Sequence, residues 1–166
     1  LSFTESLHYN LVLLLLYEAV KSKDVFKYLS KLAALELNSA IKKPSLMINN
    51  KEIVQDDLNS LLEFEQIDKL LNNIQKRKNI ILEVGAGSGR TAKTVLSIVD
   101  NVKYVIADIP PAINLCIDNL KKYFPNKNLA TAFKLDNYED LIKALENNDI
   151  LFIFPHQMKL FTKKTF

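Results

Sequence analysis

The chain has 166 residues and a net charge of +3 from 22 basic and 19 acidic residues, a length that allows one domain with a substantial core. The basic residues are scattered in short pairs, which argues against a nucleic-acid-binding surface. The longest apolar run, Leu11 to Leu16, is much shorter than the roughly 20 residues of a membrane span, and the single cysteine fits a reducing cytoplasm.

The first part of the chain carries mainly helical patterns. The expected helices run from Ser2 to about Lys21, from Asp24 to a break before Pro44, and from about Asp57 to Asn72. Between the last two, the short apolar runs 46–48 and 53–54 flank the residues Asn49-Asn50-Lys51-Glu52. Because asparagine tolerates the left-handed conformation, we expect a β-hairpin there. Residues 1–78 are thus expected to form a helical N-terminal extension with a β-hairpin.

From Asn79 onwards, apolar runs of strand length alternate with helical patterns. This alternation predicts an α/β fold with a doubly wound, parallel, Rossmann-like sheet over residues 79–166. The fourth run contains only apolar residues, which is typical of an interior strand buried on both faces. The expected strands are Ile80–Val84, Lys103–Asp108, Ala130–Leu135 and Ile150–Phe154, and the expected helices are Arg90–Val99, Ala112–Tyr123 and Tyr138–Asn147.

All three glycines of the chain, Gly85, Gly87 and Gly89, stand between the first of these strands and the helix that follows it. A tight turn without side chains at this place brings backbone close to a ligand. The dinucleotide-binding pattern G-x-G-x-x-G fails because its third glycine would fall on Arg90, and the P-loop pattern fails because its first glycine would fall on Val84. The alternative is an ordinary turn without a ligand.

The remaining pattern, E-x-G-x-G-x-G from Glu83 to Gly89, resembles motif I of the class I S-adenosylmethionine (SAM) dependent methyltransferases. SAM carries no phosphate, and its methionine carboxylate can lie near the turn and the helix N-terminus. Its ribose diol needs an acceptor pair, which Asp108 can supply at the end of the second strand. The alternative for Asp108 is an acid that only starts the next helix.

Other candidate residues follow the strands at the carboxyl edge of the sheet, where open α/β sheets bind ligands. Glu83 precedes the glycine turn, and the resemblance implies a place near the methionine amino group; it could instead only order the loop. Asp136 follows the third strand and can accept from the adenine amino group, or cap the next helix. His156 follows the fourth strand and can take the proton from an acceptor hydroxyl; it could instead only bind substrate or cap a helix.

These observations define the candidate site residues. His156 is the candidate catalytic base, and no cluster of carboxylates and histidines indicates a metal site. The residues expected to contact the cofactor are Glu83, Gly85, Ala86, Gly87, Gly89, Asp108, Ile109 and Asp136.

Over roughly residues 45–160 the chain is similar to bacterial sugar O-methyltransferases. The resemblance rests on the segments 82–90, 104–111 and 154–157, with residues 53–58 upstream. It implies methyl transfer from SAM to a sugar hydroxyl of a glycan or glycan precursor. The expected partner is therefore a small-molecule or glycan substrate, and a homo-oligomer is left open. Nothing in composition or spacing itself indicates a sugar.

Class I methyltransferases have seven strands in the spatial order 3-2-1-4-5-7-6, whereas four strands are found here. In that order the wholly apolar fourth strand would be an open edge, which invites pairing with another chain. We therefore expect a fold that is truncated after strand four, as the N-terminal part of a longer enzyme. The alternatives are a non-catalytic SAM-binding or interaction module and, less favoured because of Arg90, an NAD-dependent oxidoreductase.

Overall fold

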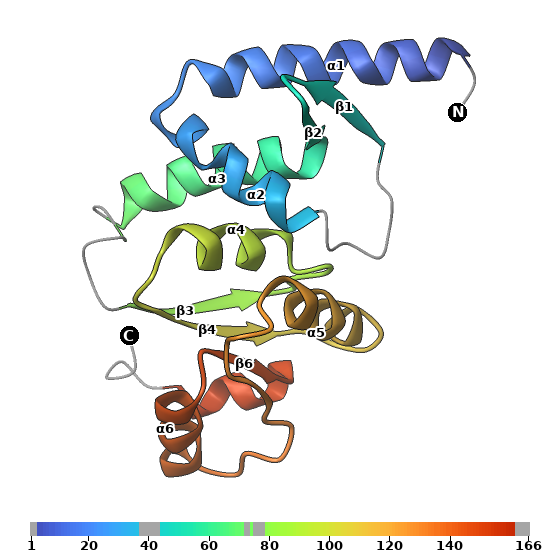
Figure 1. Cartoon of the computed structure of the whole chain (residues 1–166). Coiled ribbons are helices and arrows are strands. Elements are labelled where there is room, and N and C mark those ends of the chain that lie inside the picture. Colours follow the sequence, from blue (N-terminus) through green and yellow to red (C-terminus); the bar gives the residue numbers. More distant parts are fainter. Residues whose placement is uncertain (1–2, 37–43, 72–73, 75–78, 162–166) are drawn as a thin grey trace. The chain divides into compact units, whose positions relative to one another are not determined.

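The computed structural model describes residues 3–36, 44–71, 74 and 79–161. The chain divides into two compact units, Leu1–Asn72 and Asn73–Phe166, which are described separately (Figure 1). The expected start of the first helix at Ser2 lies outside the described residues. No helix in the described ranges combines the length and hydropathy that a membrane span requires, although α1 reaches 19 residues.

The first unit is a small helical assembly that holds a two-stranded hairpin. Its core is formed by side chains that are almost completely buried, among them Leu13, Val20, Leu32, Leu58 and Leu61. The expected second helix is a short 3₁₀ helix that continues into an α-helix, and its predicted extension towards Pro44 lies in residues 37–43, outside the described residues. The elements are α1 (Phe3–Lys21), η1 (Asp24–Tyr28), α2 (Leu29–Glu36), β1 (Ser45–Ile48), β2 (Lys51–Val54) and α3 (Gln55–Leu70).

The predicted hairpin is present, but its turn is shorter than expected. Asn49 and Asn50 have φ angles of 50° and 60°, and Ile48 pairs directly with Lys51. Two consecutive residues with positive φ form a two-residue hairpin turn, whose twist matches that of the flanking strands. Lys51 and Glu52 therefore belong to β2 and not to the connection.

The second unit is an α/β unit with one parallel four-stranded sheet. The expected helices 112–123 and 138–147 are confirmed residue for residue. The expected helix 90–99 ends at Ile98, one residue earlier than predicted. The elements are β3 (Asn79–Val84), α4 (Arg90–Ile98), β4 (Val102–Ala107), α5 (Ala112–Tyr123), β5 (Leu129–Thr131), α6 (Tyr138–Asn147), β6 (Ile150–Ile153) and η3 (Pro155–Leu160).

The sheet has helices on both faces. On one face, alternate residues of β4 and β6 pack against Leu141 and Leu145 of α6. On the other face, Tyr104 lies towards α5, whose Cys116 and Leu120 are fully buried (Figure 1). Side chains that alternate between two covered faces explain why β4 and β6 are apolar at nearly every position.

The strand order is β3-β4-β6-β5, so β6 lies inside the sheet. All four residues of β6 are buried, which confirms the expectation of an interior strand and shows that the expected open edge at this strand was wrong. The methyltransferase order would place β6 beside β3, whereas it pairs with β4. β3 contains the half-buried polar residues Asn79 and Glu83, and such a strand is better suited to an edge than wholly apolar β6.

β5 is also shorter than predicted, because it ends at Thr131 and not at Leu135. The cause is Gln157, whose side-chain amide donates to the carbonyl oxygens of Ala132 at 2.9 Å and Leu135 at 3.4 Å. These carbonyl groups are therefore satisfied by a side chain, and the segment turns away from the sheet. β6 likewise ends one residue early, since Pro155 begins η3.

Candidate functional site

The glycine loop between β3 and α4 is a left-handed backbone segment. Gly85, Gly87 and Gly89 have φ angles of +76°, +56° and +82°, values that residues with a side chain adopt at a cost. A Cβ atom added to Gly85 or Gly87 would meet no atom within 4 Å. These two glycines therefore serve the backbone conformation and leave an open, bare surface at the carboxyl end of β3.

Gly89 has a different role. A Cβ atom at this position would lie 2.8 Å from Cys116 Sγ and 3.4 Å from Leu120 Cγ, both on α5. Gly89 is itself buried, and it is also the residue that precedes the first turn of α4. The missing side chain makes room for the neighbouring helix, so this member of the expected cofactor set contacts protein and not open space.

Asp108 connects the end of β4 to the glycine loop. Its Oδ2 accepts a hydrogen bond from the Gly87 backbone N–H at 2.9 Å, and its Oδ1 accepts one from the Ile109 N–H at 2.8 Å. The side chain is nearly buried, with an exposed fraction of 8%. A carboxylate can accept about four hydrogen bonds, so acceptor capacity remains on both oxygens. The acid and the glycine turn are thus joined directly by a hydrogen bond.

Glu83 lies below the loop, towards the α5 face of the sheet. Its Oε2 accepts a hydrogen bond from the Tyr104 hydroxyl at 3.0 Å. Burial raises the pKa of Tyr104 well above its ordinary value, and the Glu83 carboxylate adds to the effect. Burial, together with the carboxylates of Glu83 and Asp108, raises the pKa of the Cys116 thiol to about 12. The hydrogen bond joins Glu83 to β4, and both roles expected for Glu83 stay predictions.

The end of β6 lies next to Asp108, because the Asp108 N–H donates to the Ile153 carbonyl at 3.3 Å. Beyond it, the ring of Phe154 stacks on Phe133 with a centroid distance of 4.2 Å and an interplanar angle of 13°. The exposed His156 ring lies on Phe154 at 5.9 Å and 30°. Aromatic pairs at such distances favour defined ring orientations. The candidate base is thus carried by a short stack of rings that begins one residue after β6.

Gln157 holds the segment after β6 in place through hydrogen bonds of its side chain. It is buried with an exposed fraction of 2%, its Oε1 accepts from the Phe154 N–H at 2.8 Å, and its amide group donates to the turn after β5. Gln157 is a residue of this site that the sequence did not indicate. A glutamine between a histidine and a methionine does not distinguish a buried amide from an exposed one.

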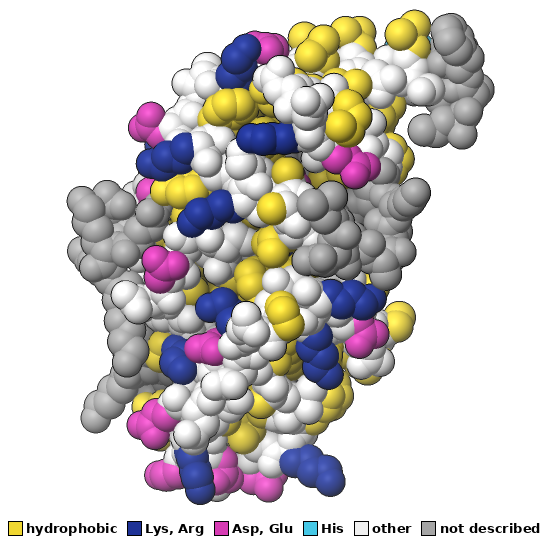
Figure 2. Space-filling model, in the orientation of Figure 1, with side chains coloured by type: hydrophobic (Ala, Val, Ile, Leu, Met, Phe, Trp, Pro, Cys, Tyr) yellow, Lys and Arg dark blue, Asp and Glu magenta, His cyan; other side chains and the backbone are white. Residues whose placement is uncertain are grey.

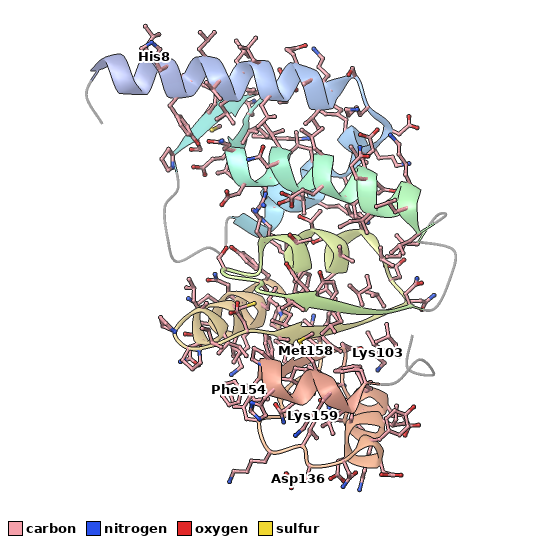
Figure 3. All side chains as sticks on the ribbon, turned by 180° about the vertical axis from the view of Figure 1, so that it is seen from behind. His8, Lys103, Asp136, Phe154, Met158 and Lys159 are labelled. Carbon is pink, nitrogen blue, oxygen red and sulfur yellow. The ribbon has the colours of Figure 1, made fainter. Side chains whose placement is uncertain are left out.

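Asp136 lies away from Asp108 but follows Leu135, whose carbonyl accepts from Gln157, the neighbour of His156, at 3.4 Å. β5 is separated from β4 by β6, which places the two strands roughly 10 Å apart. Asp136 is exposed and comes five residues after the end of β5, and in Figure 3 it lies at a distance from the labelled Phe154. The cap of α6 is its neighbour Asn137, whose side chain accepts from the Asp140 N–H at 2.9 Å. The alternative of a helix cap at Asp136 was therefore wrong, whereas its role as an acceptor for the adenine amino group stays a prediction.

The remaining expected contacts differ in exposure. Ala86 is buried at 9% exposure, whereas Ile109 is exposed at 60%. Val84, which the sequence analysis did not select, is exposed at 58% and is the last residue of β3. Val84 and Ile109 give the carboxyl ends of β3 and β4 an apolar border of the kind that often lines a cofactor site.

Within the described ranges, no group of three histidine, cysteine or acidic side chains is placed to hold a metal ion. Comparison of the chain with models of known protein families, with curated proteins and with solved structures finds no match.

Proposed function

We propose that the chain is a cytoplasmic SAM-dependent O-methyltransferase that acts on a sugar hydroxyl of a glycan or glycan precursor. The observation that carries the proposal is the hydrogen bond from the Gly87 N–H to Asp108, because it joins the glycine loop and the acid of the second strand into one site. The exposed side chains of Val84 and Ile109 border this site with apolar surface suited to a nucleoside base.

The hydrogen bonds of the loop favour a ligand without phosphate groups. The N–H groups of Gly85 and Gly89 donate to the carbonyls of Ala107 and Ala86, and that of Gly87 donates to Asp108. A pyrophosphate is normally held by such amides, so a dinucleotide would have to compete with bonds that the protein already makes. The methionine carboxylate of SAM requires fewer such amides than a pyrophosphate does.

Each residue has a defined task in this proposal. SAM, when bound, supplies a methyl group on a positively charged sulfur that a hydroxyl oxygen can attack. Asp108 accepts from the ribose hydroxyls with the lone pairs that the loop does not use. His156 takes the proton that the acceptor hydroxyl loses, and imidazole is suited to this near neutral pH. The stack of Phe133 and Phe154 holds the imidazole ring in place for the transfer.

A second candidate is a SAM-binding or interaction module without transferase activity. Two observations favour it over an active transferase. The order β3-β4-β6-β5 differs from the order that the resemblance implies, and Asp136 lies away from Asp108. Both observations concern the part of the site beyond the glycine loop. In this second candidate the cofactor site is present, but the chain does not catalyse methyl transfer.

The test is calorimetric titration of the purified chain with S-adenosylhomocysteine, the demethylated form of the cofactor, with NADH as the control ligand. Micromolar binding of S-adenosylhomocysteine alone is expected. A folded chain that binds neither ligand contradicts the proposal, and one that binds only NADH supports the oxidoreductase.

Binding and catalysis are then separated with His156→Ala. This variant should bind S-adenosylhomocysteine with unchanged affinity and should lose about 100-fold or more in methyl transfer to a sugar acceptor, the usual contribution of a general base. If the chain binds the cofactor and neither protein transfers a methyl group to any sugar acceptor tested, the non-catalytic module is the better description.

A further inference from the structure

α1 carries apolar side chains on two opposite sides, and only one side is used within its own unit. Leu13, Tyr17 and Val20 are buried, with exposed fractions of 7% or less. The other side presents five large apolar side chains with exposed fractions between 44% and 63%: Leu7, Leu11, Val12, Leu14 and Leu15. Figure 2 shows hydrophobic side chains gathered over this part of the molecule. A helix that is apolar all round is normally covered on every side.

The exposed side has the spacing of a helix-pairing seam. His8, Leu11, Leu15 and Glu18 follow one another at intervals of three, four and three residues, as the a and d positions of a coiled coil do. All four are exposed, and Figure 3 shows His8 pointing outwards from α1. Leu7, Val12 and Leu14 flank this seam. The seam thus consists of two leucine layers between one basic and one acidic residue.

This pattern is complementary to itself in one orientation. Two copies of α1 can lie antiparallel, with the two-fold axis crossing the exposed side at the level of Leu13 along the helix. Leu11 of each copy then faces Leu15 of the other. In the same register, His8 of each copy faces Glu18 of the other, so unlike groups meet at both ends. A parallel arrangement would place His8 against His8 and Glu18 against Glu18. Self-complementarity of this kind is what a two-fold symmetric interface requires.

We propose that the exposed side of α1 is a homodimer interface, formed by antiparallel pairing of α1 with α1 of a second copy of this chain. A lipid surface is a poorer partner, because Lys21 is the only lysine or arginine in α1 and amphipathic helices on anionic membranes are rich in both. One helix per copy makes a small interface, so the dimer should dissociate on dilution.

The first measurement is sedimentation velocity over a range of concentrations, where the dimer has twice the 19.0 kDa of the chain. Leu11→Glu with Leu15→Glu should raise the dissociation constant at least ~tenfold, because two apolar contacts per copy are lost. The matched control is Met47→Glu with Leu70→Glu, which changes two other exposed apolar residues of the same unit and should leave dimerisation unchanged. Circular dichroism confirms that both proteins are folded.

The register is tested by charge and by cross-linking. His8→Glu should weaken the dimer, because it places two acids opposite each other, and adding Glu18→Arg to the same chain should restore it. A mixture of a Leu11→Cys chain and a Leu15→Cys chain should form the mixed disulfide in preference to either disulfide between identical chains. A chain that stays monomeric at every concentration, or that is recovered only on anionic vesicles, overturns the proposal, as does equal loss of dimer in the control.

Discussion

The Oδ2 atom of Asp108 accepts a hydrogen bond of 2.9 Å from the backbone N–H of Gly87, which fixes the glycine loop after β3 to the end of β4. Asp108 has a second bond to the Ile109 N–H, so both of its oxygens already hold backbone groups. The proposed ribose acceptor is therefore also the anchor of the loop. Stability and cofactor binding should respond together when this side chain is changed.

Asp108→Ala removes the acceptor of both backbone N–H groups. The free energy of unfolding in urea should fall by about 1–3 kcal/mol, the cost of leaving such groups unpaired. The affinity for S-adenosylhomocysteine, measured by calorimetry, should fall by about 1.5–3 kcal/mol, the contribution of a hydrogen bond to a charged acceptor. Glu146→Ala is the matched control, because it removes an exposed acid of α6 that is not among the candidate site residues and should change neither quantity. Loss of stability with unchanged affinity would show that Asp108 only anchors the loop.

Gly87→Ala and Gly89→Ala form a second matched pair, since both residues have positive φ angles. Each should lose about 1–2 kcal/mol of stability to backbone strain alone. Gly89→Ala should lose more, because its Cβ would approach Cys116 Sγ to 2.8 Å, whereas the Cβ at Gly87 meets nothing within 4 Å. Thermal and urea unfolding measure this difference.

Cofactor binding should be most sensitive at Gly87, the position where a side chain costs less stability. Gly87→Val is expected to abolish binding of S-adenosylhomocysteine while the protein stays folded, because the new side chain occupies the open surface beside the loop. Ser88→Ala, in the same loop, leaves the glycine backbone unchanged and serves as the control. Unchanged affinity in a folded Gly87→Val chain would place the cofactor somewhere else.

In the second unit, the sequence predicted well those features that depend on residues close together in the chain. The helices 112–123 and 138–147 could be predicted because their apolar periodicity is strong and is bounded by prolines, asparagines and charged residues. The glycine loop could be predicted because three glycines at alternate positions have few other uses. The Asn49-Asn50 turn was recognised because asparagine tolerates the left-handed conformation, although the length of the turn was overestimated by two residues.

The order of the strands could not be predicted in this way. Parallel strands joined by helices can be arranged in several orders with the same pattern along the chain, and the choice depends on contacts between distant residues. The wholly apolar composition of 150–153 correctly indicated an interior strand, but the resemblance placed it at an edge. The separation of Asp136 from Asp108 follows from the same strand order, because β6 lies between β4 and β5. The short β5 follows from Gln157, whose role is visible only once the turn after β5 is close to it.

Gln157→Ala should destabilise the chain by about 1–3 kcal/mol in urea unfolding, because the Phe154 N–H and the Ala132 carbonyl lose a buried partner. His156→Ala changes the neighbouring exposed side chain and should stay within about 0.5 kcal/mol of the parent chain, as exposed substitutions usually do. If the two variants are equally stable, the Gln157 side chain does not hold the turn after β5.

Cys116 should make the stability of the chain decrease at alkaline pH. The pKa of the thiol is about 12 in the folded chain and 9.0 ordinarily, so between these values the unfolded chain loses a proton that the folded chain keeps. The free energy of unfolding should therefore fall as the pH rises above 9, by about 1.4 kcal/mol between pH 8 and pH 10 from this group alone.

Urea unfolding of the parent chain and of Cys116→Ala at both pH values isolates this contribution, because the other titrating groups are common to both proteins. Whatever stability the variant loses at pH 8, the difference between the two proteins should shift by about 1.4 kcal/mol in favour of the variant at pH 10. The folded parent should also resist alkylation by iodoacetamide at pH 8, since its thiol is buried and protonated. Parallel pH profiles with rapid alkylation would mean that Cys116 is accessible, and that α5 does not pack against Gly89 as the structure has it.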